Sequence, residues 1–320
     1  MPIKSDFDHC ESVYWVFTQL CNDQCDHCYN MSGPHGARIS EDECLAVIDN
    51  LPSRVDRLIL SGGEPLADWK KLLVILDRLG DKYGKDTQLM LQTNGDLLNE
   101  EKLDLLIEKG ISRFDIASID RYHKAAGGRL MELAELFESR GVNGDEKEPL
   151  VRKENYLHNF PLSWGYWGAT EDMWLGGNWA RGRAMQKNLW KKDHKHNFCA
   201  VLSGGIGFLG GKSEIPQEIS IQLWAINPCC PGTKKAMGDA RKDKVVDVLN
   251  RVKSSPVFRK INEGDPYGMG ESIGISREYA ESRGEQLQNI CRWCDEFFDK
   301  HYDMDRLKAI DGQKDTIKQN

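Results

Sequence analysis

Residues 18–30 read TQLCNDQCDHCYN and place Cys21, Cys25 and Cys28 in a C-x3-C-x2-C spacing. Three thiolates on one short loop can converge on a single inorganic centre, because thiolate is a soft ligand. They are one ligand short of the four that close a structural zinc site or a standard iron–sulfur cluster, so one position stays open for a small molecule. A zinc knuckle completed by His27 and three unrelated core cysteines are the plainer alternatives.

The composition of the 320-residue chain excludes several classes of function. A net charge of −7 leaves no excess of Lys and Arg for phosphates, which argues against nonspecific nucleic-acid binding. The first residues lack the apolar segment of a secretory signal, and no apolar run approaches the ~18 residues of a membrane span. Ten cysteines in this context favour a reducing compartment and metal binding over disulfides. We therefore expect a cytoplasmic protein that binds neither nucleic acid nor membrane.

From residue 12 onwards, predicted strands alternate with predicted helices at roughly thirty residues per unit. Strands are expected at 12–20, 57–60, 87–92 and 113–119, and helices at 40–51, 69–79, 99–109 and 130–140. Ser40 and Glu43 form a capping box at the first helix, and Asn99 caps the third. The alternation predicts an α/β fold with a parallel sheet, either a barrel or an open doubly wound sheet.

Every unusual motif follows the end of one of these strands. The cysteine triplet follows the first strand, and the later strands are followed by Gly62-Gly63-Glu64-Pro65, Thr93-Asn94-Gly95 and Ser118-Ile119-Asp120. Chemistry in such sheets collects at the carboxyl ends of the strands, so the four motifs should share one edge. Taken singly, each motif could be an ordinary turn or cap. Together they indicate a site in which glycines admit a ligand closely and Asp120 suits a ribose hydroxyl pair.

The order and spacing of the four motifs resemble the radical S-adenosylmethionine (radical SAM) superfamily over about residues 12–190. The resemblance implies that Cys21, Cys25 and Cys28 hold three irons of a [4Fe–4S] cluster, whose fourth iron is chelated by S-adenosylmethionine. It also implies a set of cofactor-binding residues: His27 near the adenine, Gly62, Gly63 and Glu64 at the methionine amino group, Asn94 at a strand end, Ser118 and Asp120 near the ribose, and Arg181 or Arg183 facing the carboxylate. A basic helix start is the plainer explanation of the two arginines.

The C-terminal part of the chain carries a second set of cysteines, namely Cys199, Cys229, Cys230, Cys291 and Cys294. Four thiolates from this region could close a complete metal site, with a structural zinc and free thiols as the alternatives. The arrangement resembles the twitch domain, a shortened relative of the SPASM domain, which implies an auxiliary [4Fe–4S] cluster. The family usually places a glycine five residues before its hairpin cysteine, and this chain has Trp224 and Ala225 there. This departure leaves open which of the adjacent cysteines is the ligand. One of the two is expected, and Cys229 is preferred because a proline precedes it.

These motifs divide the chain into four segments. We expect an N-terminal extension over residues 1–11, a radical SAM core over 12–190, an auxiliary cluster domain over 191–300 and a polar tail over 301–320. Within the third segment, a strand is expected at 219–226 and helices at 244–253 and 256–261. The resulting fold class is α/β, a partial (β/α)6 TIM-type barrel followed by a small iron–sulfur domain of twitch/SPASM type.

The resemblance implies an enzyme that cleaves S-adenosylmethionine reductively to a 5′-deoxyadenosyl radical, which takes a hydrogen atom from the substrate. An external one-electron reductant of flavodoxin or ferredoxin type would start the reaction. A second cluster could accept the electron left on a small-molecule or peptide substrate, giving a two-electron oxidation as in twitch enzymes that dehydrogenate aminocyclitols. Three alternatives stay open: epimerisation of a sugar or peptide residue with Cys229 or Cys230 as hydrogen donor, maturation of a ribosomal peptide, and a noncatalytic iron–sulfur protein.

Overall fold

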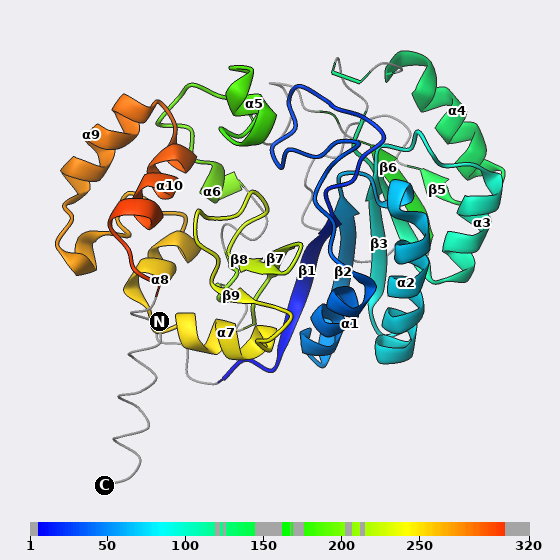
Figure 1. Ribbon diagram of the computed structural model, residues 1–320, viewed down its shortest axis with the longest axis horizontal. Helices are drawn as coiled ribbons and strands as arrows, with labels where there is room; N and C mark the ends of the chain where they lie inside the picture. Colours follow the sequence, from blue (N-terminus) through cyan, green and yellow to red (C-terminus); the bar gives the residue numbers. More distant parts are fainter. Residues whose placement is uncertain are drawn as a thin grey trace, which may run out of the picture. The chain divides into compact units, whose positions relative to one another are not determined.

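The computed structural model describes residues 6–118, 122–123, 126–144, 162–166, 168, 176–201, 207–211 and 215–304. The chain divides into two compact units. The first comprises residues 12–49 and 54–191, and the second comprises residues 1–11, 50–53 and 192–320. Figure 1 labels the helices and strands of both units along the chain.

The first unit alternates strands and helices as expected. Its strands are β1 (His9–Thr18, whose first three residues belong to the second unit), β2 (Arg54–Gly62), β3 (Gln88–Thr93), β4 (Ile111–Ile116), β5 (Asn143–Gly144) and β6 (Ser163–Tyr166). Its helices are α1 (Glu41–Asn50), the 3-10 turn η1 (Pro65–Asp68), α2 (Trp69–Tyr83), α3 (Glu100–Glu108), α4 (Ala126–Glu138) and α5 (Gly182–Gln186). The capping box is confirmed, because the Ser40 N–H donates to Glu43 Oε2 at 2.8 Å and the Glu43 N–H donates to Ser40 Oγ at 3.2 Å. The Asn99 cap is confirmed by its 2.9 Å bond from the Lys102 N–H.

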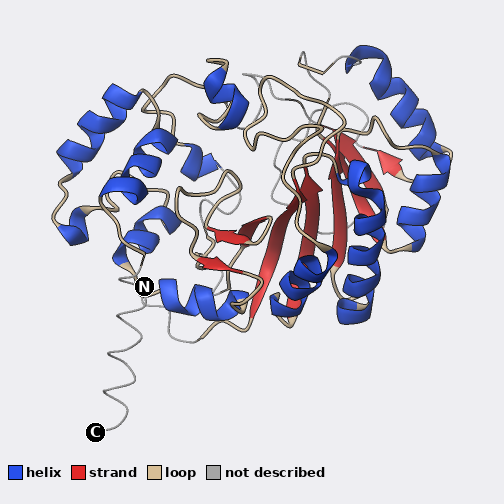
Figure 2. Ribbon diagram, in the orientation of Figure 1, coloured by secondary structure: helices blue, strands red, loops and turns tan. Residues whose placement is uncertain are grey.

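The strands of this unit lie in the order β5-β6-β4-β3-β2-β1. The pairs β2–β3, β3–β4, β4–β6 and β5–β6 are parallel. The sheet is open and does not close into a complete barrel, which confirms the α/β class and the partial barrel (Figure 2).

The two faces of this sheet differ in character. Phe137 of α4 packs against the apolar face, with its ring centroid 5.4 Å from that of Phe114 on β4 and 4.9 Å from that of Trp164 on β6. Arg113 and Asp115 flank Phe114 on β4 and therefore point to the opposite face. The helix-packed face thus supplies the core, and the other face carries buried polar groups.

The second unit contains a small antiparallel ladder and several helices. Its elements are α6 (Phe198–Val201), β7 (Glu218–Gln222), β8 (Ala225–Asn227), β9 (Gly238–Asp239), α7 (Val245–Val252), α8 (Pro256–Asn262), η2 (Glu271–Ile273), α9 (Arg277–Leu287) and α10 (Ile290–Lys300). Helices α7 and α8 confirm the two helices expected from the sequence.

The prediction of a single strand at 219–226 is wrong. Strands β7 and β8 form an antiparallel hairpin in which Gln222 pairs with Ala225, so Leu223 and Trp224 make the turn. Leu223 has φ of 57°, a conformation that turns usually assign to Gly or Asn. The turn therefore carries no sequence signal, because the apolar residues Leu223 to Ile226 run through it without a Gly, Asn or Asp.

Helices α9 and α10 were not predicted. Ser276 caps α9 by accepting the Tyr279 N–H at 3.2 Å, and Asn289 caps α10 by accepting the Cys291 N–H at 2.8 Å. The C-x2-C pair therefore lies in the first turns of a helix. Among the helices that the structure describes, none has both the length and the apolar composition needed to cross a bilayer.

Candidate functional site

The cysteine loop, which comprises residues 19–38, begins where β1 ends, and its first residues lie against the end of β2. The Gly63 N–H donates to the Thr18 carbonyl and the Glu64 N–H to the Leu20 carbonyl, both at 2.8 Å. A Cβ on Gly63 would lie 2.5 Å from the Leu20 carbonyl oxygen, closer than any side chain tolerates. A Cβ on Gly62 would lie 2.8 Å from the Thr18 carbonyl oxygen, so both glycines are needed for the close approach of the two backbones directly before Cys21.

The two ends of the loop are fastened together by Asp68, which is buried at the end of η1. Its carboxylate accepts bonds from Arg38 Nε at 2.9 Å, Thr18 Oγ1 at 3.2 Å and Lys71 Nζ at 3.1 Å. Burial opposes ionisation of this carboxyl, but the bonds from Arg38 and Lys71 outweigh it and hold the pKa of Asp68 below its usual range. Since Thr18 precedes the cysteines and Arg38 follows them, the loop is closed at its base.

The three thiols of the loop lie within electrostatic reach of one another. Burial is the main cause that raises the pKa of Cys21 to about 12, and it also raises the pKa of Cys25. The Cys28 thiol adds to both shifts, and Cys21 adds to that of Cys25. Thiols in such surroundings lose their protons when a cationic centre binds, which is the behaviour of metal ligands. The donor set therefore fits a shared thiolate-bound centre.

Polar neighbours surround these sulfur atoms. The Asp23 N–H donates to Cys21 Sγ at 3.4 Å, the Cys25 thiol donates to Asp23 Oδ2 at 3.3 Å, and the Cys28 thiol donates to Asn30 Oδ1 at 3.0 Å. Among the residues that the structure describes, Asp23, Cys25 and His123 form the one group whose ligand atoms all lie within 4.8 Å of one another. No role was expected for Asp23, because only the fold brings its carboxylate beside the Cys25 thiol.

Glu64 is completely buried and fully engaged. Its Oε1 accepts the Leu66 N–H at 2.9 Å and the Thr93 hydroxyl at 2.6 Å, and its Oε2 accepts the Asn94 N–H at 2.7 Å. Burial raises its pKa to about 7, although these three bonds favour the ionised form. The carboxylate thus joins the end of β2 to the end of β3.

A chain of hydrogen bonds continues from Glu64 across the sheet edge. The Ser118 hydroxyl, just after β4, donates to the Asn94 carbonyl at 2.7 Å. Asn94 Nδ2 donates to Asn22 Oδ1 at 2.9 Å, which brings the chain back to the cysteine loop. The ends of three strands and the loop therefore meet at one edge. Asp120 lies outside the described residues.

His27 and the two arginines have different surroundings. The His27 ring stacks on Tyr122 with centroids 4.7 Å apart. Arg183 is buried, with its Nε donating to the Cys25 carbonyl at 2.9 Å and its N–H to the Cys28 carbonyl at 2.8 Å. Arg181 is half-buried at the start of α5. Arg183 thus holds the backbone of the cysteine loop, and Tyr122 is an aromatic neighbour that sequence reasoning missed.

The polar face of the sheet holds two further groups that were not anticipated. The Tyr14 hydroxyl lies 2.8 Å from Ser61 Oγ and donates to Gln92 Oε1 at 2.7 Å. Arg113 Nε pairs with Asp115 Oδ1 at 3.0 Å, and both side chains are buried. Charged residues alternating with apolar ones inside a buried strand were the available signal.

The second set of cysteines lies in the other unit. Cys291 and Cys294 are three residues apart on α10, so their side chains share one face of the helix, and both are buried. Cys199 lies on α6, and Cys229 and Cys230 follow β8, where Gln222 Nε2 donates to the Cys230 carbonyl at 2.7 Å.

Comparison with known families now bears on this geometry. Residues 15–129 match the family model of the radical SAM superfamily. The matched range contains the cysteine loop and the strand-end residues that bond to one another around it. Residues 15–129 are a radical SAM domain. Members of this family use a [4Fe–4S] cluster and S-adenosylmethionine, and the three thiols of the cysteine loop fit the cluster.

The radical SAM domain also has individual relatives. An uncharacterized protein of Archaeoglobus fulgidus is 32% identical over 98 residues, which are 30% of this chain and only 22% of that protein. The structure of BtrN in complex with AdoMet and 2-DOIA is 14% identical, with 82% of this chain and 90% of that one covered and a TM-score of 0.49. Native anSMEcpe with bound AdoMet is 13% identical, with 93% and 98% covered and a TM-score of 0.47. Streptococcus suis SuiB is 12% identical, with 80% and 68% covered and a TM-score of 0.42. Identities this low say nothing about the reaction.

We expect Gly63→Ala to destabilise the protein by about 1–3 kcal/mol, because the new methyl group forces the cysteine loop away from β2. It should also reduce the iron retained after anaerobic reconstitution. Gly80→Ala is the matched control, since a Cβ at this position in α2 meets nothing within 4 Å. That change should stabilise the helix by about 0.5–1 kcal/mol. Urea unfolding and iron analysis measure both effects, and equal iron in the two variants would contradict the role given to Gly63.

Glu64 should make stability depend on pH. The pKa of Glu64 is about 7 in the folded chain and near the ordinary value of 4.5 when unfolded, so the folded chain binds more protons between these values. The contribution of Glu64 to stability is thus full below pH 4.5 and is lost as pH rises through 7. Glu64→Gln cannot titrate, so the stability of the wild type relative to this variant should fall between pH 5 and pH 8. Urea unfolding at both pH values tests this, and an unchanged difference would show that Glu64 is already ionised at pH 5.

Proposed function

We propose that this chain is a radical SAM enzyme that oxidises a polar substrate by two electrons. Cys21, Cys25 and Cys28 would hold the cluster that binds S-adenosylmethionine. A second [4Fe–4S] cluster, held by Cys199, Cys291, Cys294 and either Cys229 or Cys230, would accept an electron. The observation that carries the proposal is that Cys291 and Cys294 share one buried face of α10, in the unit that also contains Cys199, Cys229 and Cys230.

The loop contacts assign roles to the residues of the first site. When bound and reduced, the cluster and S-adenosylmethionine supply a 5′-deoxyadenosyl radical, which removes a hydrogen atom from a C–H bond. Asp68 and Arg183 hold the loop in place, one at its base and the other at the Cys25 and Cys28 carbonyls. His27 and Tyr122 offer stacked rings for the adenine. These contacts support a preorganised loop, which keeps the reacting atoms in register.

Hydrogen bonds within the protein limit which groups remain available to bind S-adenosylmethionine. The Glu64 carboxylate is occupied by three internal donors, so the methionine amino group would be bound by backbone carbonyls of Gly62 and Gly63. Asn94, Ser118 and Asp120 would lie toward the ribose. Arg183 is held by the loop carbonyls, which leaves Arg181 as the arginine for the carboxylate.

In the proposed oxidation, the substrate would lose one hydrogen atom to the 5′-deoxyadenosyl group, giving 5′-deoxyadenosine beside methionine. It would then lose one proton to solvent and one electron to the second cluster. An external one-electron reductant of flavodoxin or ferredoxin type supplies the electron that starts each cycle. The product has two hydrogens fewer than the substrate.

The polar face of the sheet supports a hydrogen-bonding substrate. Tyr14, Ser61 and Gln92 form one buried group, and the Arg113–Asp115 pair forms another, bonded to Ser163 Oγ at 3.1 Å. A buried ion pair contributes little to folding, so its presence on the face opposite Phe114 and α4 favours a role in binding. A small polar molecule or a peptide residue fits these groups better than an apolar compound.

The test is the iron and labile sulfide bound per chain after anaerobic reconstitution. The wild type should bind about eight of each, and a Cys291→Ala, Cys294→Ala variant about four, because one of two [4Fe–4S] clusters is lost. A Cys10→Ala, Cys44→Ala variant is the control, since both residues are buried cysteines outside the two proposed ligand sets. Single Cys229→Ala and Cys230→Ala variants identify the fourth ligand.

A value of about four in the wild type and in the Cys291→Ala, Cys294→Ala variant would remove the electron-acceptor mechanism. The fate of hydrogen separates the remaining reactions. A dehydrogenase gives a product lacking two hydrogens, whereas an epimerase in deuterated water gives a product of unchanged composition that carries solvent deuterium.

A further inference from the structure

The loop of residues 264–267 is hydrogen-bonded to both segments that carry cysteines of the proposed second site. The Tyr267 hydroxyl donates to the His194 carbonyl at 2.8 Å, and Asn197 Nδ2 donates to the Gly264 carbonyl at 2.7 Å. Trp293, between Cys291 and Cys294 on α10, donates from Nε1 to the Pro266 carbonyl at 3.0 Å. The loop therefore connects the 193–199 segment, which leads to Cys199, with the helix that carries the other two thiols.

A second contact attaches the 193–199 segment directly to the start of α10. Asp193 forms a parallel β-bridge with Asn289. The Asn289 side chain is buried and accepts the Cys291 N–H at 2.8 Å, so the same residue caps α10. The 193–199 segment is thus attached to the start of α10 directly and through the 264–267 loop.

A glycine in helix α9 makes room for the Tyr267 ring. Gly284 lies in the interior of α9, where glycine costs roughly 1 kcal/mol relative to alanine. A Cβ at Gly284 would lie 2.2 Å from the Tyr267 hydroxyl and 2.5 Å from Cε1. The glycine therefore makes room for the tyrosine, which reaches past α9 to the His194 carbonyl.

The surroundings of the Tyr267 hydroxyl keep it protonated. Burial is the main cause that raises the pKa of Tyr267 to about 12, and the acidic groups that add to the shift include Cys291 and Cys199. A tyrosine with this pKa stays protonated at neutral pH, so its hydroxyl remains a hydrogen-bond donor to His194.

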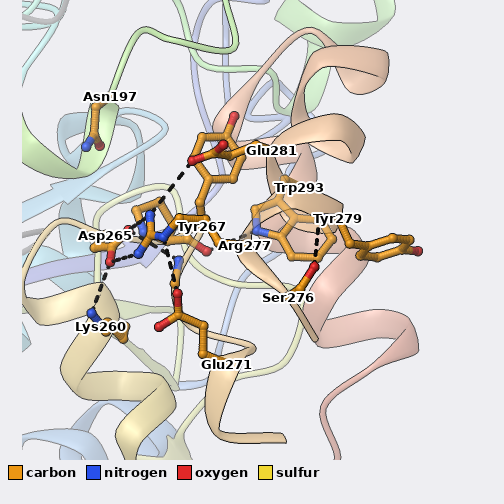
Figure 3. A network of polar contacts seen from close by, with 12 residues as sticks. Asn197, Lys260, Asp265, Tyr267, Glu271, Ser276, Arg277, Tyr279, Glu281 and Trp293 are labelled. Atoms are coloured by element: carbon orange, nitrogen blue, oxygen red, sulfur yellow. Dashed lines mark hydrogen bonds and ion pairs between the residues drawn. The ribbon is translucent and has the colours of Figure 1, made fainter. Parts of the chain in front are cut away.

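Ion pairs fix the loop itself. Arg277, at the start of α9, places Nη1 3.0 Å from Asp265 Oδ1 and Nη2 2.6 Å from Asp265 Oδ2 (Figure 3). Lys260 Nζ adds a 3.2 Å bond to Oδ2. The hydrogen bonds from Arg277, followed by Lys260, hold the pKa of Asp265 below its usual range despite partial burial. The backbone that presents Tyr267 is therefore anchored on α9 and α8.

We propose that Tyr267 is a positioning residue, which holds the segment leading to Cys199 beside α10 so that Cys199, Cys291 and Cys294 can bind one centre. This inference rests on the proposed second metal site. Tyr267 acts through the His194 carbonyl and is not itself a ligand. Removing the hydroxyl should loosen Cys199 without altering α10.

The test uses the full-length chain with Cys21→Ala, Cys25→Ala and Cys28→Ala, so that the cysteine loop contributes no thiolate. Cadmium is the probe, because thiolate-to-cadmium absorption reports converging thiolates without requiring iron or sulfide. Tyr267→Phe keeps the ring and removes only the hydroxyl, and Gly284→Ala displaces the ring. We expect each to lower cadmium affinity by about tenfold or more, as loss of groups that orient ligands typically does. The second cluster reconstituted in Tyr267→Phe should also show a changed electron paramagnetic resonance spectrum.

Arg283→Gln is the matched control. Arg283 lies on α9 and pairs with both oxygens of Glu296 on α10 at 2.8 Å, so the change breaks a contact between the same helices without touching the loop. Its cadmium affinity should stay within about twofold of the parent chain. Equal affinities in Tyr267→Phe and Arg283→Gln would overturn the role of Tyr267.

The outcomes separate this inference from the proposed function. A parent chain that binds cadmium through its thiolates but forms no iron–sulfur cluster would end the two-electron oxidation, and the variants would still test Tyr267. A full second cluster with unchanged cadmium affinity in Tyr267→Phe would leave the oxidation standing and remove the positioning role. No cadmium–thiolate absorption in the parent chain would overturn the inference, because no shared site would exist.

Discussion

The close approach of the end of β2 to the chain entering the cysteine loop is the constraint on which the first site depends. Gly63 and Glu64 bond through their N–H groups to carbonyls on either side of Gln19, and this contact leaves no space for a Cβ at residue 63. The loop after Cys21 has no regular secondary structure, so its shape must be set from outside. The same β2 terminus carries the Glu64 carboxylate to the end of β3. The backbone contact between the end of β2 and residues 18–20 therefore positions the thiols relative to the ends of β2 and β3.

The charged residues around the cysteine loop bind to its backbone and to neighbouring strand ends, and so hold the loop in place. Asp68 joins the two ends of the loop, Arg183 binds the Cys25 and Cys28 carbonyls, and Glu64 binds two N–H groups and a hydroxyl. Buried charges with complete hydrogen bonding stiffen their surroundings, while an unpaired one would be costly. A cluster-binding loop benefits from such stiffness, because its ligands must hold their geometry with few regular backbone contacts. In the second unit, Asp265, Arg277 and Tyr267 likewise hold the 264–267 loop and the 193–199 segment in place.

Much of the first unit could be predicted from the sequence, because its signals are local. Periodicity located the strands and helices, Ser40 and Asn99 marked helix starts, and the rule that parallel strands end at one edge brought Glu64, Asn94 and Ser118 together. The hairpin at Leu223 could not be predicted, because a leucine supplies the left-handed turn conformation. Asn22 and Tyr267 were also missed, since their partners lie far along the chain and only the fold joins them. Arg113 was missed although its partner Asp115 lies two residues away on the same strand. Asp23 is adjacent to the cysteines, yet its place beside Cys25 depends on the shape of the loop.

The central claim is that the Cys21, Cys25 and Cys28 loop supports reductive cleavage of S-adenosylmethionine. The most direct measurement is the 5′-deoxyadenosine formed when the anaerobically reconstituted chain is reduced with dithionite in the presence of S-adenosylmethionine. The wild type should form it, and so should the Cys291→Ala, Cys294→Ala variant, whereas Cys25→Ala should form none above the protein-free control. A wild-type chain that holds its iron and sulfide but forms no 5′-deoxyadenosine would contradict the account and indicate a noncatalytic iron–sulfur protein.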